Sequence, residues 1–176
     1  MIFLEDYAQV MVENCHFTYV AVADDGQVIG LISGLYQKNF DKKLSKAYDY
    51  KRHYGLAVKF MLKYFTGLYY LSDGFKRDFK IFFAKLQERN DKMVGVCDCE
   101  LAALTTRKEY RKGLGTALVN KMVEHCREKN VKTIRVFTNT ASTYGFYDKY
   151  GFDLVKEVLF TIKGVSGRSL IYELEI

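Results

Sequence analysis

The pattern of apolar and polar positions divides the first half of the chain into recognisable elements. Apolar residues at helical spacing over Glu5–Asn14 predict one short helix. Phe17–Ala23 and Val28–Tyr36 then alternate with a period of two, and Asp24–Gly26 between them is typical of a hairpin turn. From Lys38 to Arg89 the apolar residues return to helical spacing, which predicts a run of helices.

The second half of the chain alternates strands with helices. We expect a strand over Met93–Thr105, a helix over Gly115–Lys129, a strand over Thr133–Phe137, a helix over Ala141–Tyr150, and a closing strand pair, Leu154–Ile162 and Ser169–Glu175, around a turn at Gly164–Gly167. The chain contains no proline, no repeat and no low-complexity linker. It is therefore interpreted as a single domain, residues 1–176.

Length and composition fit a globular protein. A chain of 176 residues with 49% apolar residues can bury a core without disulfides or metals. The longest apolar stretch, Leu56–Leu71, is interrupted by Lys59, Lys63 and Gly67, which argues against a membrane span. The first residues lack the pattern of a secretory signal, so a cytoplasmic location is expected.

The positive charge is concentrated in one segment. The chain carries a net charge of +6, but Lys38–Lys92 alone holds 14 Lys or Arg against 6 Asp or Glu. A basic protein can handle polyphosphates or nucleic acid. A solvated basic helical surface is an equally good interpretation.

The cysteines do not form a recognisable metal motif. Cys97 and Cys99 are two residues apart in a strand-like run, and no histidine follows at ligand spacing, so we expect buried reduced thiols and no metal. His125 lies on the predicted helix Gly115–Lys129 and is interpreted as half-buried or solvated.

A glycine-containing turn precedes that same helix. In Tyr110–Thr116, Gly113 and Gly115 allow an anion to approach the backbone N–H groups at the positive end of a helix dipole. A dinucleotide fingerprint needs a third glycine where Leu118 stands, and a Walker loop needs Gly-Lys-Ser/Thr. The turn alone is weak evidence, and a plain helix start is the alternative.

A second segment, Asn139–Phe152, makes the combination specific. Together the two segments resemble the phosphate and pantetheine sites of the GNAT superfamily of N-acetyltransferases. The family motif is Gln/Arg-x-x-Gly-x-Gly/Ala, and Arg111–Gly115 is one residue short of it. The resemblance implies a mixed α+β fold: a central mixed, mostly antiparallel sheet flanked by helices. Here a helical insertion, residues 38–92, would separate the third and fourth strands, and the first strand and helix are missing or reduced.

The resemblance also implies acetyl-CoA as co-substrate and assigns residues to it. The residues that match the family's coenzyme-binding positions are Leu104, Thr105, Thr106, Arg111, Lys112, Gly113, Leu114, Gly115, Thr116, Asn139, Ser142 and Phe146. Tyr147 matches the tyrosine placed near the CoA sulfur, where a phenol can protonate the leaving thiolate. A core aromatic is the alternative for Tyr147.

Direct transfer to an amine also needs a base. Asp98 and Glu100 lie on one face of the predicted strand Met93–Thr105, because side chains of a strand repeat every two residues. Glu100 lies four residues before Leu104, where some family members place a catalytic glutamate, and a surface carboxylate is the alternative interpretation. Glu100 is the expected base, with Asp98 or a water relay as alternatives.

The expected function is therefore that of an acyltransferase. An acetyl group would pass to a primary amine of a small molecule or peptide by direct transfer in a ternary complex. The competing hypotheses are a catalytically silent module that binds acyl-CoA or a protein, and a nucleic-acid binder that uses Lys38–Lys92. We expect no membrane partner, and a homodimer is left open.

Overall fold

The computed structural model describes residues 15–37, 97–140, 142–162 and 165–176, together with positions 6, 9, 12–13, 55, 58–63, 66 and 68. Its elements in chain order are β1 (Phe17–Val22), β2 (Val28–Tyr36), β3 (Cys99–Thr106), the short 3-10 helix η1 (Lys108–Tyr110), α5 (Arg111–Glu128), β4 (Thr133–Asn139), α6 (Gly145–Tyr150), β5 (Asp153–Ile162) and β6 (Val165–Glu175). The described elements therefore confirm a mixed α and β architecture.

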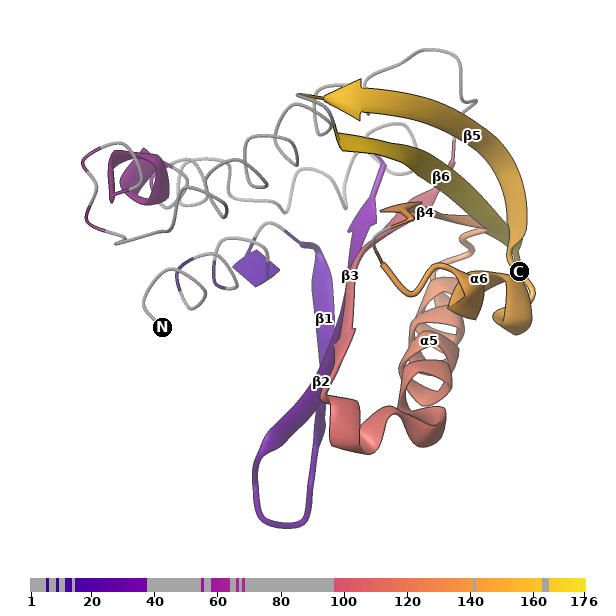
Figure 1. The fold of residues 1–176 in the computed structure, drawn as a ribbon. Helices are drawn as coiled ribbons and strands as arrows, with labels where there is room; N and C mark the ends of the chain where they lie inside the picture. The colour runs from indigo at the N-terminus through magenta and orange to yellow at the C-terminus, as the bar shows by residue number, and fades with distance from the viewer. Residues whose placement is uncertain are drawn as a thin grey trace.

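The six described strands form one sheet in the order β1-β2-β3-β4-β6-β5. All neighbouring pairs are antiparallel except β3 and β4, which are parallel. Figure 1 shows α5 and α6 on the same side of this sheet. The expected mostly antiparallel sheet with flanking helices is confirmed.

The core lies between α5 and the sheet. The inward side of α5 carries Leu118, Val119, Met122, Val123 and Cys126, all buried. The strands contribute side chains from alternate positions, because successive residues of a strand point to opposite faces. These buried strand residues include Ile32, Cys99, Leu101, Ile134, Val136, Leu170 and Tyr172. Residues between them, such as Glu100 and Arg135, therefore belong to the opposite face.

The parallel pair at the centre of the sheet is short. β3 and β4 are in register only at Cys99↔Ile134, Glu100↔Arg135 and Leu101↔Val136. Both strands continue beyond this point, β3 paired with β2 as far as Thr106 and β4 paired with β6 as far as Asn139. The two strands separate after the third pair, so a gap opens in the middle of the sheet.

The residue before β3 fastens the start of this parallel pair. The Asp98 carboxylate accepts hydrogen bonds from the backbone N–H groups of Lys132 (2.7 Å) and Thr133 (3.3 Å). The Asp98 N–H donates to Thr133 Oγ1 at 3.1 Å, and the Gln37 N–H donates to the Asp98 carbonyl at 2.9 Å. Asp98 thus joins three strands where β3 and β4 begin, and it lies just before β3 instead of within the strand as expected.

Several predicted boundaries shift. The β1–β2 turn is confirmed, with Gly26 at φ 81°. Helix α6 begins at Gly145, later than the expected Ala141, because Ser142 closes a turn by donating its N–H to the Asn139 carbonyl (3.1 Å). The closing turn was placed wrongly: Ile162 pairs with Val165, so β6 starts four residues before the expected Ser169.

Other predictions fall on undescribed residues. Of the Glu5–Asn14 helix, positions 6, 9 and 12–13 are helical, and of the 38–92 insertion, positions 55 and 58–63 are helical. The remainder of the insertion and the expected strand start at Met93 lie outside the described residues. In the part of the chain that is described, no helix is long and apolar enough to cross a membrane.

We predict that Asp98→Ala lowers the free energy of unfolding by about 1–3 kcal/mol, because the Lys132 and Thr133 N–H groups lose their acceptor. Asp98→Asn, which keeps one acceptor oxygen, should cost less. Denaturant unfolding of the three proteins would measure both effects. Equal stability of Asp98→Ala and the wild type would show that the carboxylate does not fasten the β3–β4 pair.

Candidate active site

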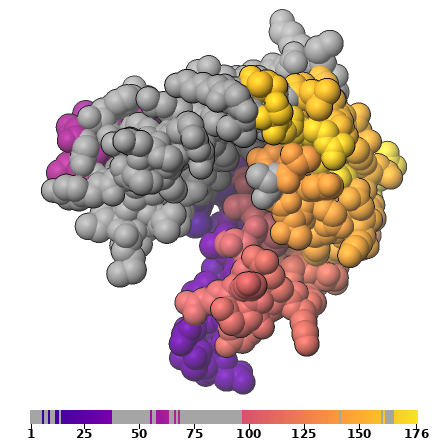
Figure 2. Space-filling model, in the orientation of Figure 1, coloured from indigo at the N-terminus to yellow at the C-terminus, as the bar shows by residue number. Residues whose placement is uncertain are grey.

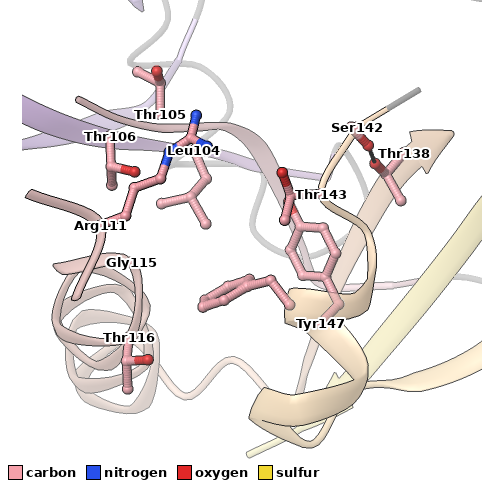
Figure 3. Close-up of a pocket in the computed structure, with 11 residues that line it drawn as sticks. Leu104, Thr105, Thr106, Arg111, Gly115, Thr116, Thr138, Ser142, Thr143 and Tyr147 are labelled. Carbon is pink, nitrogen blue, oxygen red and sulfur yellow. Dashed lines mark hydrogen bonds between the residues drawn. The ribbon is translucent and has the colours of Figure 1, made fainter. Parts of the chain in front are cut away.

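A cavity of about 420 Å³ lies where β3 and β4 separate. Residues from β3, the start of α5, the end of β4 and α6 face one another across it, as Figure 3 shows. The lining residues are Leu104, Thr105, Thr106, Arg111, Gly115, Thr116, Thr138, Ser142, Thr143, Phe146 and Tyr147. Nine of these eleven were among the residues predicted from the sequence, so the fold brings most of the predicted site together.

The β3 wall offers backbone groups to the cavity. The Arg107 N–H donates to the Ile29 carbonyl of β2 at 2.8 Å, so the backbone of Arg107 and of Thr105, two residues earlier, is directed toward β2. Successive residues of a strand direct their N–H and C=O groups to opposite sides. The backbone groups of Leu104 and Thr106 are therefore directed into the gap, where an extended ligand could pair with them as an added strand would.

The start of α5 forms the end of the cavity. Gly113 has φ 83°, in the left-handed region that favours glycine, and Lys112 just before it is also non-helical. This turn begins the regular helix again at Leu114, and the first N–H groups of a helix lack intrahelical acceptors. The first turn carries no acidic residue, and Arg111 is basic. The arrangement is suited to an anion such as a pyrophosphate.

Gly115 allows this helix to approach the opposite wall. A Cβ atom built at Gly115 would lie 3.3 Å from the Phe146 ring, which is tighter than an ordinary contact. The close approach brings the α5 terminus and α6 to opposite sides of one narrow cavity. Gly113, in contrast, has open space around it, and its requirement for glycine is conformational.

The far wall is held by hydroxyl groups. Thr138 Oγ1 and Ser142 Oγ lie 2.5 Å apart in a hydrogen bond, drawn in Figure 3, and Ser142 Oγ also donates to the Asn139 carbonyl at 2.7 Å. These bonds fix the turn between β4 and α6. Thr138 and Thr143 line the cavity but were not predicted, although strand alternation from the inward-facing Val136 would have identified Thr138.

Tyr147 is both a core residue and a wall of the cavity. It is 9% exposed, and its ring packs against Phe152 (centroids 5.5 Å apart), Tyr172 (5.7 Å) and Phe146 (5.4 Å). Burial raises the pKa of the Tyr147 phenol to about 12. The phenol is therefore protonated throughout the neutral range. The burial of the ring confirms the core interpretation, and the role of Tyr147 as proton donor stays a prediction.

Glu100 lies on the other face of the sheet and does not line the cavity. Its side chain is 7% exposed, and Gln37 Nε2 donates to its Oε2 at 3.5 Å. Four residues separate it from Leu104, about 13 Å along an extended strand. A proton could reach Glu100 from the cavity only through an intervening group such as water.

Four other predicted binding residues do not line the cavity. Lys112 and Gly113 shape the turn, and Leu114 packs partly buried against the core next to Gly30. Asn139 ends β4 in the strand face of Arg135, one residue beyond the cavity-lining Thr138. Their assignment to coenzyme binding stays a prediction.

His125 has a structural environment away from the cavity. Its two ring nitrogens bond the hydroxyls of Tyr19 (2.8 Å) and Tyr36 (2.7 Å), and its ring lies 4.3 Å from that of Phe17. Burial lowers the pKa of His125. It is half-buried, as the sequence indicated, and it joins α5 to the β1–β2 hairpin.

With this geometry in place, comparison with known proteins identifies the family. The model of the acetyltransferase (GNAT) family matches residues 2–152, and the chain belongs to that family. It is 41% identical over 58 residues to the uncharacterized protein YxbD of Bacillus subtilis (strain 168). That match covers 32% of this chain and 36% of YxbD, so it spans little more than a third of that relative.

Two solved structures share the fold. An IAA acetyltransferase from Bacillus cereus ATCC 14579 superposes with a TM-score of 0.53 at 14% identity, over 98% of this chain and 85% of that one. An acetyltransferase from Bacillus anthracis str. Ames, solved in complex with acetyl coenzyme A, has a TM-score of 0.52 at 16% identity. That match covers 90% of this chain and 61% of the Bacillus anthracis protein.

The raised pKa of Tyr147 predicts a loss of stability in alkali. Above pH 10 the unfolded state releases this proton, whereas the folded state holds it until about pH 12. The stability that the protonated phenol contributes is therefore complete below pH 10 and is lost as the pH rises through about 12. The difference in unfolding free energy between wild type and Tyr147→Phe should fall by about 2 kcal/mol across this window. Parallel curves of unfolding free energy against pH for the two proteins would contradict the raised pKa of Tyr147.

Proposed function

We propose that this protein is an acetyl-CoA-dependent N-acetyltransferase that acetylates a primary amine of a small molecule or peptide. The observation that carries the proposal is the cavity itself. It brings together the start of α5, which is suited to an anion, the unpaired backbone groups of β3 and the buried Tyr147. The binding of acetyl coenzyme A by the Bacillus anthracis protein of the same fold supports this choice of donor.

The residues divide the binding of acetyl-CoA among them. The N–H groups at the start of α5, with Arg111, would hold the pyrophosphate. The backbone groups of Leu104 and Thr106 would pair with the pantetheine arm, and Asn139, Ser142 and α6 would enclose it. The backbone N–H of Leu104, which is directed into the gap, would polarise the thioester carbonyl as the amine attacks.

Two proton transfers complete the reaction. The attacking amine must lose a proton, which Glu100 would accept through a water relay, since its carboxylate lies outside the cavity. The C–S bond then breaks and the sulfur takes a proton from Tyr147. The products are the acetylated amine and free CoA. Direct transfer in a ternary complex needs no acyl-enzyme, and none of the roles proposed here is that of a nucleophile.

Thermal unfolding can test whether the start of α5 binds the phosphates of acetyl-CoA. Acetyl-CoA at a hundredfold excess over Kd should raise Tm by about 5–10 °C, because it binds only the folded state. Gly113→Asp should abolish this shift, since its carboxylate would repel the phosphates.

Gly26→Asp is a matched control for that variant. Gly26 lies in the β1–β2 turn at φ 81°, and Gly113 has φ 83°, with open space around both. The two variants therefore carry the same backbone strain, and only Gly113→Asp should lose the acetyl-CoA shift. If Gly113→Asp kept the rise in Tm with acetyl-CoA, the start of α5 would not be the phosphate site.

Tyr147→Phe should reduce kcat by about 10- to 1,000-fold with little change in the affinity for acetyl-CoA, because the ring still packs and only the proton donor is lost. Tyr150→Phe, on the same helix, removes a hydroxyl that bonds Asn120 outside the cavity, and it should keep its activity. Release of free CoA thiol with a panel of amines measures both. If Tyr147→Phe matches the wild type at every pH, another acid must serve.

Glu100→Gln should keep the fold and acetyl-CoA binding but remove the acidic limb of the rate–pH profile. Activity should partly return at high pH, where more of the amine is already deprotonated. An unaltered profile would favour a base other than Glu100. An inactive wild type that still binds acetyl-CoA would instead indicate a silent binding module, and salt-sensitive nucleic-acid binding that survives Gly113→Asp would indicate the nucleic-acid alternative.

A further inference from the structure

A row of charged side chains crosses the sheet on the face opposite α5. Glu100 of β3 is in register with Arg135 of β4, and Arg135 is in register with Glu173 of β6. Residues directly opposite in neighbouring strands share a face and lie about 5 Å apart at Cβ. The three side chains are therefore consecutive neighbours, with the cation between two carboxylates.

Two members of this row are buried, and Glu173 is half-buried. Glu100 is 7% exposed and Arg135 is 6% exposed. Arg135 Nε donates to Glu173 Oε1 at 2.6 Å, and its Nη2 donates to the same oxygen. A buried charge is tolerated only when a partner compensates for its lost hydration. In low-dielectric surroundings, the charges of one row act on each other strongly.

Four further described groups near Glu100 are neutral or negative. The Gln37 amide bonds the Glu100 carboxylate, and Cys15 and Cys97 feel the Glu100 charge. The thiols of both cysteines have a pKa of about 11, raised mainly by burial, so they are neutral. Asp98, the nearest other carboxylate in sequence, is bonded to the start of β4. Among these described neighbours, Arg135 is the cation.

We propose that Arg135 is a positioning residue for the base: its guanidinium, oriented by Glu173, keeps the Glu100 carboxylate ionised and able to accept the acceptor's proton. The inference rests on the proposed function of Glu100 and adds the group that would make a buried carboxylate usable as a base. Burial alone would favour the protonated carboxyl, which cannot accept a proton. The Glu173 carboxylate has a second effect, because it offsets part of the Arg135 charge that Glu100 experiences.

The arrangement predicts opposite effects from the two partners. Arg135→Gln removes the cation and should move the acidic limb of kcat/KM to higher pH by about 1–2 units. Glu173→Gln leaves the full Arg135 charge for Glu100, so it should move the limb to lower pH. The double variant Arg135→Gln/Glu173→Gln removes one charge of each sign and should lie between the single variants, whereas Arg135→Lys keeps the cation and should stay near the wild type.

The experiment measures two quantities in the full-length protein. One is the pH profile of kcat/KM, and the other is the pKa of the Glu100 carboxyl by carbon NMR, with Glu100→Gln used to identify its resonance. Shifts of opposite sign in Arg135→Gln and Glu173→Gln would support the proposal. The proposal would be overturned if both variants lost stability and activity while the acidic limb of kcat/KM and the pKa of the Glu100 carboxyl stayed unchanged. Arg135 and Glu173 would then form a merely structural ion pair.

The design separates this inference from the proposed function. If the carboxyl pKa moves as expected but the rate profile does not follow, Arg135 controls Glu100 and the assignment of Glu100 as base fails. Should Arg135→Gln not fold, the other two variants still decide. A Glu100 pKa that falls in Glu173→Gln and rises again in Arg135→Gln/Glu173→Gln requires the Arg135 charge.

Discussion

The parallel pairing of β3 with β4 stops after three residues, and the candidate site depends on this limit. Backbone N–H and C=O groups that leave one partner must find another. β2 satisfies one side of β3 as far as Thr106, but beyond Leu101 the groups directed toward β4 face a gap. The cavity is therefore an incomplete part of a sheet, and the groups that β3 offers to a ligand are main-chain atoms, which substitutions other than proline leave in place.

Helix α5 links the two sides of this gap. It packs on β1, β2 and β3, its first turn forms the end of the cavity, and Gly115 approaches Phe146 of α6 on the other side. One element thus stabilises the fold and presents the anion site. The two glycines of the turn act differently, since Gly113 supplies a left-handed backbone and Gly115 a close contact with Phe146. Figure 2 shows the β1–β2 hairpin and residues of the β3–α5 region together at one end of the molecule.

Most of the sheet and both helices of the second half could be predicted from the sequence, because strand alternation and the apolar side of α5 are strong local signals. The predicted ends of elements were wrong where a side chain makes hydrogen bonds with the backbone. Ser142 delays α6 by closing its own turn, and Asp98 precedes β3 and accepts hydrogen bonds at the start of β4. The register of Arg135 with Glu100 could not be predicted, since a strand pairing that joins residues 35 apart leaves no trace in a local pattern.

The shortness of the central pairing also bears on how the protein opens. The sheet consists of two antiparallel halves, β1-β2-β3 and β4-β6-β5, joined by only three registered residues of each central strand. Parallel contacts across a long sequence separation form slowly, because the loop between them must close first. We therefore expect this seam to be the boundary between two cooperative units in hydrogen exchange, with the amides of β2 and β6 protected longest. A ligand that pairs with β3 and also contacts α6 would bridge the seam, so its binding would couple the two units.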